Sequence, residues 1–364
     1  MPGLNRRLIL AASAALAACG SSPPEGRSAP PRPGATPALR ELAPFPMGVA
    51  VSDGHLADPA FAALVASQFS QVTPDFEMKM EYILLPDGTY RFDRPDRIAA
   101  FTRAHGQRLY CTTLIWYAQD PVAFHPLDGA GQRFADAFDR YIADVMGRYR
   151  GQAVGWDVVN EPVAEDGDGL RASIWSRNLG ATDYMVRAFE QAKAADPEAV
   201  LFINEYGFES KPAKLATFLR LVEGLLKRGV EIGGIGTQTH VNIDTPPGAI
   251  LNAVGEVARF GLPVHLSELD CSFRGGRPLD LRPVGEKLQA QARVYGEAME
   301  AFLRLPPRQR FAFTMWGARD RDSFLRDPPN AGDGTDQPLA FTDDGEPKPA
   351  FWALADALSR RAKA

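Results

Sequence analysis

The sequence predicts a closed barrel of eight parallel β-strands that alternate with helices. From about Phe45 onward, short runs rich in β-branched and aromatic residues alternate with longer amphipathic stretches, which is typical of a parallel sheet covered by helices. Eight such units within roughly 320 residues fit a (β/α)8 barrel, an α/β fold of one domain. The alternative is an open, doubly wound sheet, but no Gly-x-Gly-x-x-Gly follows the first strand.

Each element of this barrel is predicted from its own residue pattern. The strands are expected at residues 47–51, 69–73, 109–115, 154–159, 200–204, 235–238, 264–267 and 311–315. The clearest helices are expected at residues 134–149, 183–195, 212–228, 249–260 and 281–305. In the last of these, Val284, Leu288, Ala292 and Tyr295 recur with helical spacing, which indicates one buried face. We therefore expect a single barrel domain over residues 45–364.

Composition and charge exclude several classes of protein. Of the 364 residues, 45% are apolar, which is enough for a full core and argues against a disordered chain. The formal net charge of −5 argues against a nucleic-acid-binding protein, which needs a basic face. No spacing of Cys and His is typical of a metal site. Cys111 and Cys271 lie in apolar segments, which favours buried free thiols over a disulfide.

The first 18 residues are typical of an export signal. Arg6 and Arg7 precede an apolar run that is shorter than the about 20 residues needed to cross a bilayer. The run ends in Leu-Ala-Ala-Cys-Gly at residues 16–20, which resembles a bacterial lipobox. We therefore expect cleavage before Cys19 and lipidation of this residue. Ordinary secretory cleavage near Ala18 is the alternative.

The segment that follows the signal is expected to be a tether. Residues 19–44 are rich in Pro, Ser, Gly and Ala, which is typical of a flexible linker. Acyl chains on Cys19 would attach the protein to a membrane. Gly20 follows this cysteine, where an Asp would indicate retention at the inner membrane. We therefore expect an exported bacterial lipoprotein at the outer membrane or its periplasmic face.

Polar side chains gather where four of the predicted strands end. The strand at 154–159 runs into Asn160 and Glu161, and the strand at 264–267 runs into Glu268. Gln238 and His240 follow the sixth strand, and Trp316 follows the eighth. Because the carboxyl ends of barrel strands carry the chemistry in this fold, we expect these side chains to surround one opening.

Glu161 and Glu268 together point to the cleavage of a glycosidic bond. That reaction needs an acid for the departing oxygen and a carboxylate for the sugar carbon, about 5–5.5 Å apart when configuration is retained. Burial and the neighbouring negative charge would raise the pKa of the acid. Each glutamate by itself is more typical of a salt-bridged loop residue. The combination of the two motifs, at the ends of the fourth and seventh strands, favours a catalytic pair.

With these motifs in order, the sequence resembles family 10 of the glycoside hydrolases, the endo-β-1,4-xylanase family. The resemblance covers about residues 46–354. The matching segments are residues 69–79, 113–116, 156–162, 236–240, 267–270, 314–317, 337–341 and 347–351.

The resemblance implies a retaining, endo-acting hydrolase of β-1,4-xylosidic bonds in xylan or xylo-oligosaccharides. Catalysis by carboxyl groups needs no cofactor, and no motif requires a metal. We expect a monomer. It implies that Glu161 is the acid/base and Glu268 the nucleophile. It also implies that Asp270 orients His240 through a hydrogen bond. The sugar-binding residues that it implies are Lys79, Trp116, Gln119, Asn160, Gln238, His240 and Trp316.

The sequence departs from the family pattern at several sugar contacts. Phe76 stands where the family has Asn, Thr112 and Tyr117 where it has His, and Phe324 where it has Trp. Lost hydrogen bonds to hydroxyls change specificity strongly. We therefore expect relaxed or altered specificity, with glucosides accepted besides xylosides.

Two alternatives remain open. One is a β-1,4-glucanase or mixed β-glycosidase of the same barrel clan, against which Gln238, His240 and the residue 156–162 motif argue. The other is a non-catalytic glycan-binding lipoprotein. The joint presence of Glu161 and Glu268 argues against it, because a binder needs no such pair.

Overall fold

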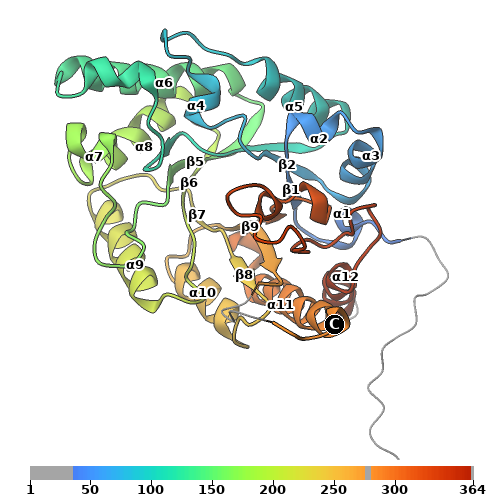
Figure 1. The fold of residues 1–364 in the computed structure, drawn as a ribbon. Coiled ribbons are helices and arrows are strands. Elements are labelled where there is room, and N and C mark those ends of the chain that lie inside the picture. Colours follow the sequence, from blue (N-terminus) through green and yellow to red (C-terminus); the bar gives the residue numbers. More distant parts are fainter. Residues whose placement is uncertain (1–35, 275–279, 362–364) are drawn as a thin grey trace, which may run out of the picture. The chain divides into compact units, whose positions relative to one another are not determined.

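The structure, a computed structural model, describes residues 36–274 and 280–361. One sheet contains all ten described strands. Eight of them follow one another in the order β10-β1-β2-β3-β5-β6-β7-β9, and β9 pairs with β10, so that the sheet closes. Strand pairing is parallel around the ring, and helices surround it (Figure 1). This arrangement confirms the single-domain (β/α)8 barrel.

The strands lie close to their predicted positions. Those of the barrel are β1 (Met47–Val51), β2 (Gln71–Pro74), β3 (Arg108–Cys111), β5 (Ala153–Asn160), β6 (Val200–Glu205), β7 (Gly234–Thr237), β9 (Val264–Ser272) and β10 (Arg310–Met315). Two short strands, β4 (Ile115–Trp116) and β8 (His240–Asn242), extend the pairing of β5 and β9 at the carboxyl ends of the barrel strands.

The helices form the outer layer. They are α1 (Leu39–Leu42), α2 (Asp53–Leu56), α3 (Pro59–Gln68), α4 (Met80–Ile83), α5 (Asp93–Ala104), α6 (Gln132–Tyr149), α7 (Ile174–Leu179), α8 (Asp183–Ala195), α9 (Pro212–Lys227), α10 (Ala249–Ala258), α11 (Val284–Arg304) and α12 (Pro349–Arg361). The short 3-10 helices are η1 (Val122–Leu127), η2 (Pro307–Gln309), η3 (Asp320–Asp322) and η4 (Phe324–Arg326).

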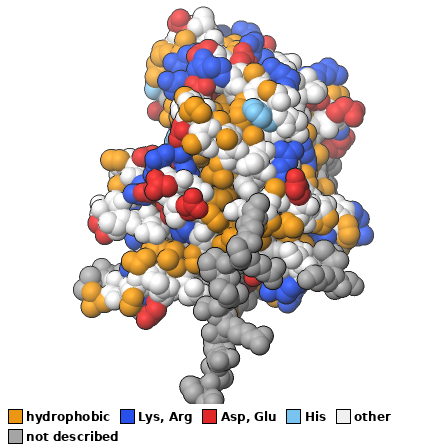
Figure 2. Space-filling view, turned by 90° about the vertical axis from the view of Figure 1, so that its right-hand side faces the viewer, with side chains coloured by type: hydrophobic (Ala, Val, Ile, Leu, Met, Phe, Trp, Pro, Cys, Tyr) orange, Lys and Arg blue, Asp and Glu red, His pale blue; other side chains and the backbone are white. Residues whose placement is uncertain are grey.

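The outer helices are held against the sheet by apolar stripes. In α6, the buried residues Phe134, Phe138, Tyr141, Val145 and Tyr149 recur every three or four positions, which places them on one face of the helix. The opposite face of α6 is charged. The face of the molecule in Figure 2 mixes acidic and basic side chains, and its described residues form no continuous basic stripe.

Aromatic side chains fill the inside of the barrel below the carboxyl ends of the strands. The rings of Tyr110, Phe202 and Phe311 lie 4.6 to 5.7 Å apart, and His265 packs edge-on against Tyr110 at 4.4 Å. His265 is fully buried, and one of its ring nitrogens hydrogen-bonds Thr314 Oγ1 at 2.7 Å. The barrel is therefore a packed core with chemistry only at its ends.

Two predicted strands differ in extent from the observed ones. The third strand stops at Cys111, because Thr113 Oγ1 and the Leu114 amide both bond to the Asp157 carbonyl of the neighbouring strand. The seventh strand was expected to end at Ser267 but continues to Ser272, because β8 pairs with its second half. Glu268 therefore lies within a strand, which fixes its backbone more firmly than a loop would.

The predictions for the amino-terminal region fall largely outside the described residues. The predicted signal at residues 1–18 and the predicted lipidation site Cys19 lie there. Within the range predicted as tether, α1 forms and Leu39 is fully buried, so this part packs on the barrel. No helix among the described residues has the length and apolar character to cross a membrane. Cys111 and Cys271 are buried free thiols, which confirms the expectation for both.

Candidate active site

Four neighbouring strands bring the predicted polar residues to one end of the barrel. Glu161 follows β5, Asn204 lies near the end of β6, Gln238 follows β7, and Glu268 lies in β9. Because all four strands run parallel and are adjacent in the sheet, their carboxyl ends form one side of the same opening. The spatial convergence expected from the sequence is therefore present.

A chain of side-chain amides connects the two glutamates. Gln238 Nε2 donates to Glu161 Oε1 at 3.0 Å, and Asn160 Nδ2 lies 3.3 Å from the same oxygen. Asn204 Nδ2 donates both to Asn160 Oδ1 at 2.9 Å and to Glu268 Oε1 at 2.8 Å. Since each amide contacts the next, the two carboxylates face one shared cluster.

Asn204 is a site residue that the sequence prediction missed. Its side chain occupies space that only Gly236 leaves open, because a Cβ at position 236 would lie 2.2 Å from Asn204 Oδ1. Ser267 Oγ donates to that same oxygen at 2.9 Å and fixes the orientation of the amide. Asn204 could have been found from its position near the end of a predicted barrel strand, because the same reasoning pointed to Asn160.

Glu161 lies among neutral hydrogen-bond donors. Besides Gln238, the indole Nε1 of Trp116 donates to Glu161 Oε2 at 2.8 Å. Burial raises the pKa of Glu161, hydrogen bonds from Gln238 and Trp116 lower it, and the charge of Glu268 raises it again, with a net upward shift. Glu161 also has a φ of 54°, which non-glycine residues rarely adopt. The pKa shift is in the direction that an acid catalyst needs.

Glu268 lies beside an ionisable histidine. His240 Nε2 is 3.3 Å from Glu268 Oε2, and His240 Nδ1 is 2.9 Å from Asp270 Oδ2. Burial lowers the pKa of His240, but the carboxylates of Asp270 and Glu268 outweigh it and raise the pKa well above its usual value. His240 is therefore an imidazolium at neutral pH, with one N–H for each carboxylate. The predicted hydrogen bond between His240 and Asp270 is present, with His240 Nδ1 as the donor.

A cation and two indoles border the same opening. Lys79 Nζ lies 5.4 Å from the ring centre of Trp116 and 6.0 Å from that of Trp316. Trp316 also meets the ring of His240 edge-on, with centres 6.2 Å apart. Flat indole faces with a nearby polar donor suit the apolar face and the hydroxyls of a sugar ring.

Gln119 lies beneath the opening and is only 2% exposed. Its Oε1 accepts a hydrogen bond from the Trp116 backbone amide at 2.9 Å, so it holds Trp116 in place. Its Nε2 is buried and has no hydrogen-bond partner among the described residues. Contact with substrate, which the resemblance implied for Gln119, stays a prediction.

The residues that depart from the family pattern lie in distinct surroundings. The guanidinium carbon of Arg171 lies 4.0 Å from the ring centre of Tyr117. Arg171 also donates a hydrogen bond to the Tyr206 hydroxyl at 2.7 Å. Phe324 lies 5.5 Å from the His240 ring, whereas Phe76 packs against Tyr82. Thr112, in contrast to these three residues, is buried.

No cluster of His, Cys, Asp or Glu with the geometry of a metal site occurs among residues 36–274 and 280–361. The described polar groups of the opening are those of acid–base and nucleophilic chemistry by carboxyl groups.

Comparison with known proteins places this geometry in a family. The sequence profile of glycosyl hydrolase family 10 matches residues 39–357. Endo-1,4-beta-xylanase A of Cellvibrio japonicus is 33% identical over 353 residues, covering 89% of this chain and 57% of that protein. Exoglucanase XynX of Acetivibrio thermocellus is 34% identical over 325 residues, covering 86% of this chain and 28% of that protein. The chain therefore spans less than two thirds of the length of these relatives.

The solved structures agree with this result. A thermostable mutant of the xylanase Xyn10A from Cellvibrio japonicus superimposes with a TM-score of 0.80 at 31% identity, covering 88% of this chain and all of that one, 100%. The matched region contains every barrel strand and both glutamates. This chain belongs to glycosyl hydrolase family 10.

Proposed function

We propose that this protein hydrolyses internal β-1,4-xylosidic bonds of xylan and xylo-oligosaccharides with retention of configuration. The observation that carries the proposal is the difference between the two glutamates. Glu161 contacts neutral donors and its pKa is raised, whereas Glu268 has the His240 imidazolium at 3.3 Å. An acid that keeps its proton and a carboxylate beside a cation are the two groups that this reaction needs.

The proposed reaction has two steps. In the first, Glu161 gives its proton to the glycosidic oxygen while Glu268 attacks the anomeric carbon, so that an ester forms and the leaving sugar departs. In the second, the Glu161 carboxylate takes a proton from water, and the resulting hydroxide attacks the anomeric carbon and frees Glu268. The indole N–H of Trp116 and the Gln238 amide hold Glu161 through both steps.

The two roles are tested with aryl β-xylosides on the full chain. Glu268→Ala is expected to lower kcat by at least about 10⁴-fold, and added azide is expected to restore turnover as an α-glycosyl azide. Glu161→Ala is expected to cleave a dinitrophenyl xyloside, which needs no acid, and with azide to form the β-glycosyl azide.

Glu190→Gln is the matched control, because this carboxyl is exposed on the outer helix α8. It is expected to keep nearly full activity. The assignment of roles would be refuted if Glu268→Ala gave the β-glycosyl azide and Glu161→Ala the α-glycosyl azide. Normal turnover by Glu268→Ala would refute it as well.

A second candidate is that glucosides are accepted besides xylosides. Two observations favour it: Phe324, smaller than Trp, packs on His240 at the sugar opening, and one relative is named an exoglucanase. A pocket change of this size is worth about tenfold or more in discrimination. We expect cellotetraose to be cleaved at a measurable rate and Phe324→Trp to lower its kcat/KM relative to xylotetraose. Cleavage of xylan alone by the wild type would contradict this candidate.

We also propose that the protein is exported and anchored to a membrane, at the outer membrane, through acyl chains on Cys19. The support is the apolar run that ends in the lipobox-like residues 16–20. Metabolic labelling with a fatty-acid probe is expected to mark the wild type but not Cys19→Ser. Equal fractionation of both proteins with membranes would argue against the anchor.

A further inference from the structure

A second cavity lies at the end of the barrel opposite the glutamates. Its volume is about 530 Å³, and its lining comes from the amino-terminal ends of strands. Arg108 begins β3, Arg310 begins β10, and Pro263 directly precedes β9. Since barrel strands run parallel, these residues lie a full strand length away from the catalytic opening. The cavity is therefore independent of the proposed hydrolysis.

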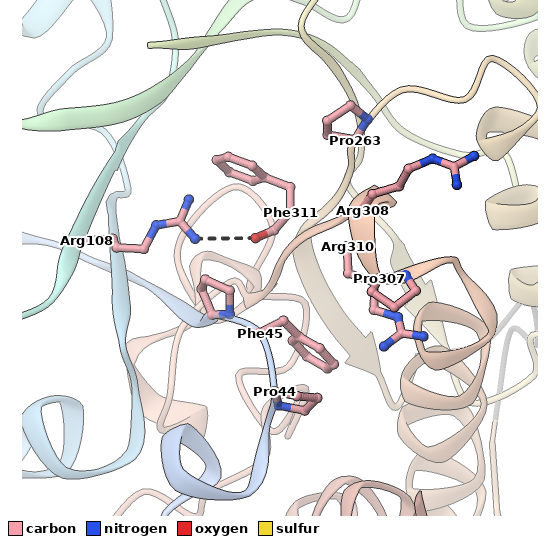
Figure 3. A pocket seen from close by; sticks show the side chains of 9 residues that line it. Pro44, Phe45, Arg108, Pro263, Pro307, Arg308, Arg310 and Phe311 are labelled. Atoms are coloured by element: carbon pink, nitrogen blue, oxygen red, sulfur yellow. Dashed lines mark hydrogen bonds between the residues drawn. The ribbon is translucent and has the colours of Figure 1, made fainter. Parts of the chain in front are cut away.

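The charge of this cavity is positive. Among its nine described lining residues are three arginines, Arg108, Arg308 and Arg310, and neither Asp nor Glu. In Figure 3, Arg108 reaches in from one wall, whereas Arg308 and Arg310 lie on the opposite side. Because the described lining residues include no carboxylate beside Arg108 and Arg308, this part of the cavity is complementary to an anion.

Arg108 is the cation that most needs a partner. Its guanidinium lies 4.7 Å from the Phe311 ring centre, and within residues 36–274 and 280–361 its side chain donates one hydrogen bond, to the Phe311 carbonyl at 3.4 Å. Burial lowers the pKa of Arg108, and no carboxylate of the described residues offsets this effect. A partly buried charge without a counter-ion is costly, so an anion that reached it would be bound favourably.

The two other arginines differ in mobility. Arg310 is fixed, because its guanidinium donates to the carbonyls of Leu303 and Leu305. Arg308 is exposed on η2 and can turn toward a bound group. Phe45 and several prolines complete the rim with apolar surface. A fixed cation, a mobile one and an apolar rim suit an anion that carries an organic substituent.

We propose that this cavity binds a phosphate group borne by an organic molecule, either a soluble phosphate ester or the head group of an anionic phospholipid. Guanidinium groups match tetrahedral oxyanions through paired N–H donors, which favours phosphate over a simple halide. The described residues of the lining carry no carboxyl, imidazole, hydroxyl or thiol group. The site is therefore proposed to bind and not to catalyse.

The first test titrates the full chain with inorganic phosphate and with glycerol 3-phosphate at constant ionic strength, measured by calorimetry. We expect saturable binding that Arg108→Gln weakens at least tenfold and Arg308→Ala weakens severalfold. Arg150→Ala is the matched control, because Arg150 is exposed before β5 at the same end but does not line the cavity. Unchanged aryl xyloside hydrolysis shows that each variant is folded.

The second test separates the two sources of the phosphate. Binding of the full chain to phosphatidylglycerol vesicles is compared with binding to phosphatidylcholine vesicles, so that any acyl anchor contributes equally to both. A preference for phosphatidylglycerol that Arg108→Gln abolishes assigns the head group, and binding of glycerol 3-phosphate without that preference assigns a soluble ester. The proposal would be overturned if the full chain showed neither saturable phosphate binding nor a preference for phosphatidylglycerol. An equal loss of binding in Arg150→Ala would also overturn it.

Discussion

The surroundings of Glu161 and Glu268 differ although both glutamates share one cluster of amides. Glu161 receives hydrogen bonds from an indole and from carboxamides, all of them neutral. Glu268 receives one from Asn204 and lies beside the His240 imidazolium, which Asp270 supports from behind. Burial raises the pKa of Glu161 more than its neutral donors lower it, whereas a neighbouring cation favours negative charge. The difference teaches how one cleft can place two identical side chains in two electrostatic surroundings.

The largest expected effect comes from removing the amide on the Glu268 side. Asn204→Ala leaves Glu268 Oε1 and Asn160 Oδ1 without their shared donor, and we expect kcat for an aryl xyloside to fall by about 10²–10³-fold, as for other preorganised donors. Ser267→Ala, which only loosens Asn204, is expected to cost much less. Equal losses in the two variants would show that Asn204 acts through packing alone.

A pH profile sharpens the comparison on the Glu161 side. Gln238 donates to Glu161 and lowers its pKa, so Gln238→Ala is expected to raise that pKa. Because the acid must be protonated, activity is lost as pH rises through its pKa, and the alkaline limb of kcat/KM should move to higher pH.

Asn204→Ala provides the internal control for this profile, since Asn204 donates to Glu268 and not to Glu161. Its alkaline limb is expected to stay in place. A downward movement in Gln238→Ala would contradict the assignment of that limb to Glu161.

The smallest expected effect concerns a third carboxyl group, beneath both glutamates. Asp157 accepts a hydrogen bond from the Tyr110 hydroxyl at 2.6 Å, and burial raises its pKa from 3.8 to about 8. The folded state therefore holds a proton that the unfolded state releases between about pH 4 and 8, so the free energy of unfolding falls as pH rises through that window.

Asp157→Asn removes this titration but keeps the acceptor for Tyr110. Urea unfolding of the two proteins at several pH values is expected to give a difference in free energy that changes by at most about 1.4 kcal/mol per pH unit. Parallel pH dependences would show that Asp157 is ionised in the folded protein.

Sequence motifs located most of the site because its chemistry depends on residues that follow strands. Glu161, Gln238 and Trp316 each stand within two residues of the end of a predicted strand, and the structure places them at one opening. Gln119 shows the limit of that reasoning. It lies close in sequence to Trp116, but its side chain turns inward and holds the Trp116 backbone. Sequence proximity does not reveal side-chain direction within a loop.

The same limit applies to the length of β9 and to Asn204. The residue pattern of 264–267 indicated a strand, but its extension to Ser272 depends on pairing with β8, which is distant in sequence. Asn204 enters the site because Gly236 leaves room for it. Neither feature has a local signature.

By itself the sequence determined the barrel, its family and the identity of the glutamate pair, because strand and helix periodicity and short motifs are local properties of the chain. Only the tertiary structure decided which partners each glutamate has, and that Arg108 faces a cavity whose described lining residues include no carboxylate. The physical reason is that proton affinity and uncompensated charge depend on burial and on neighbours contributed by other strands, and these exist only once the barrel has closed.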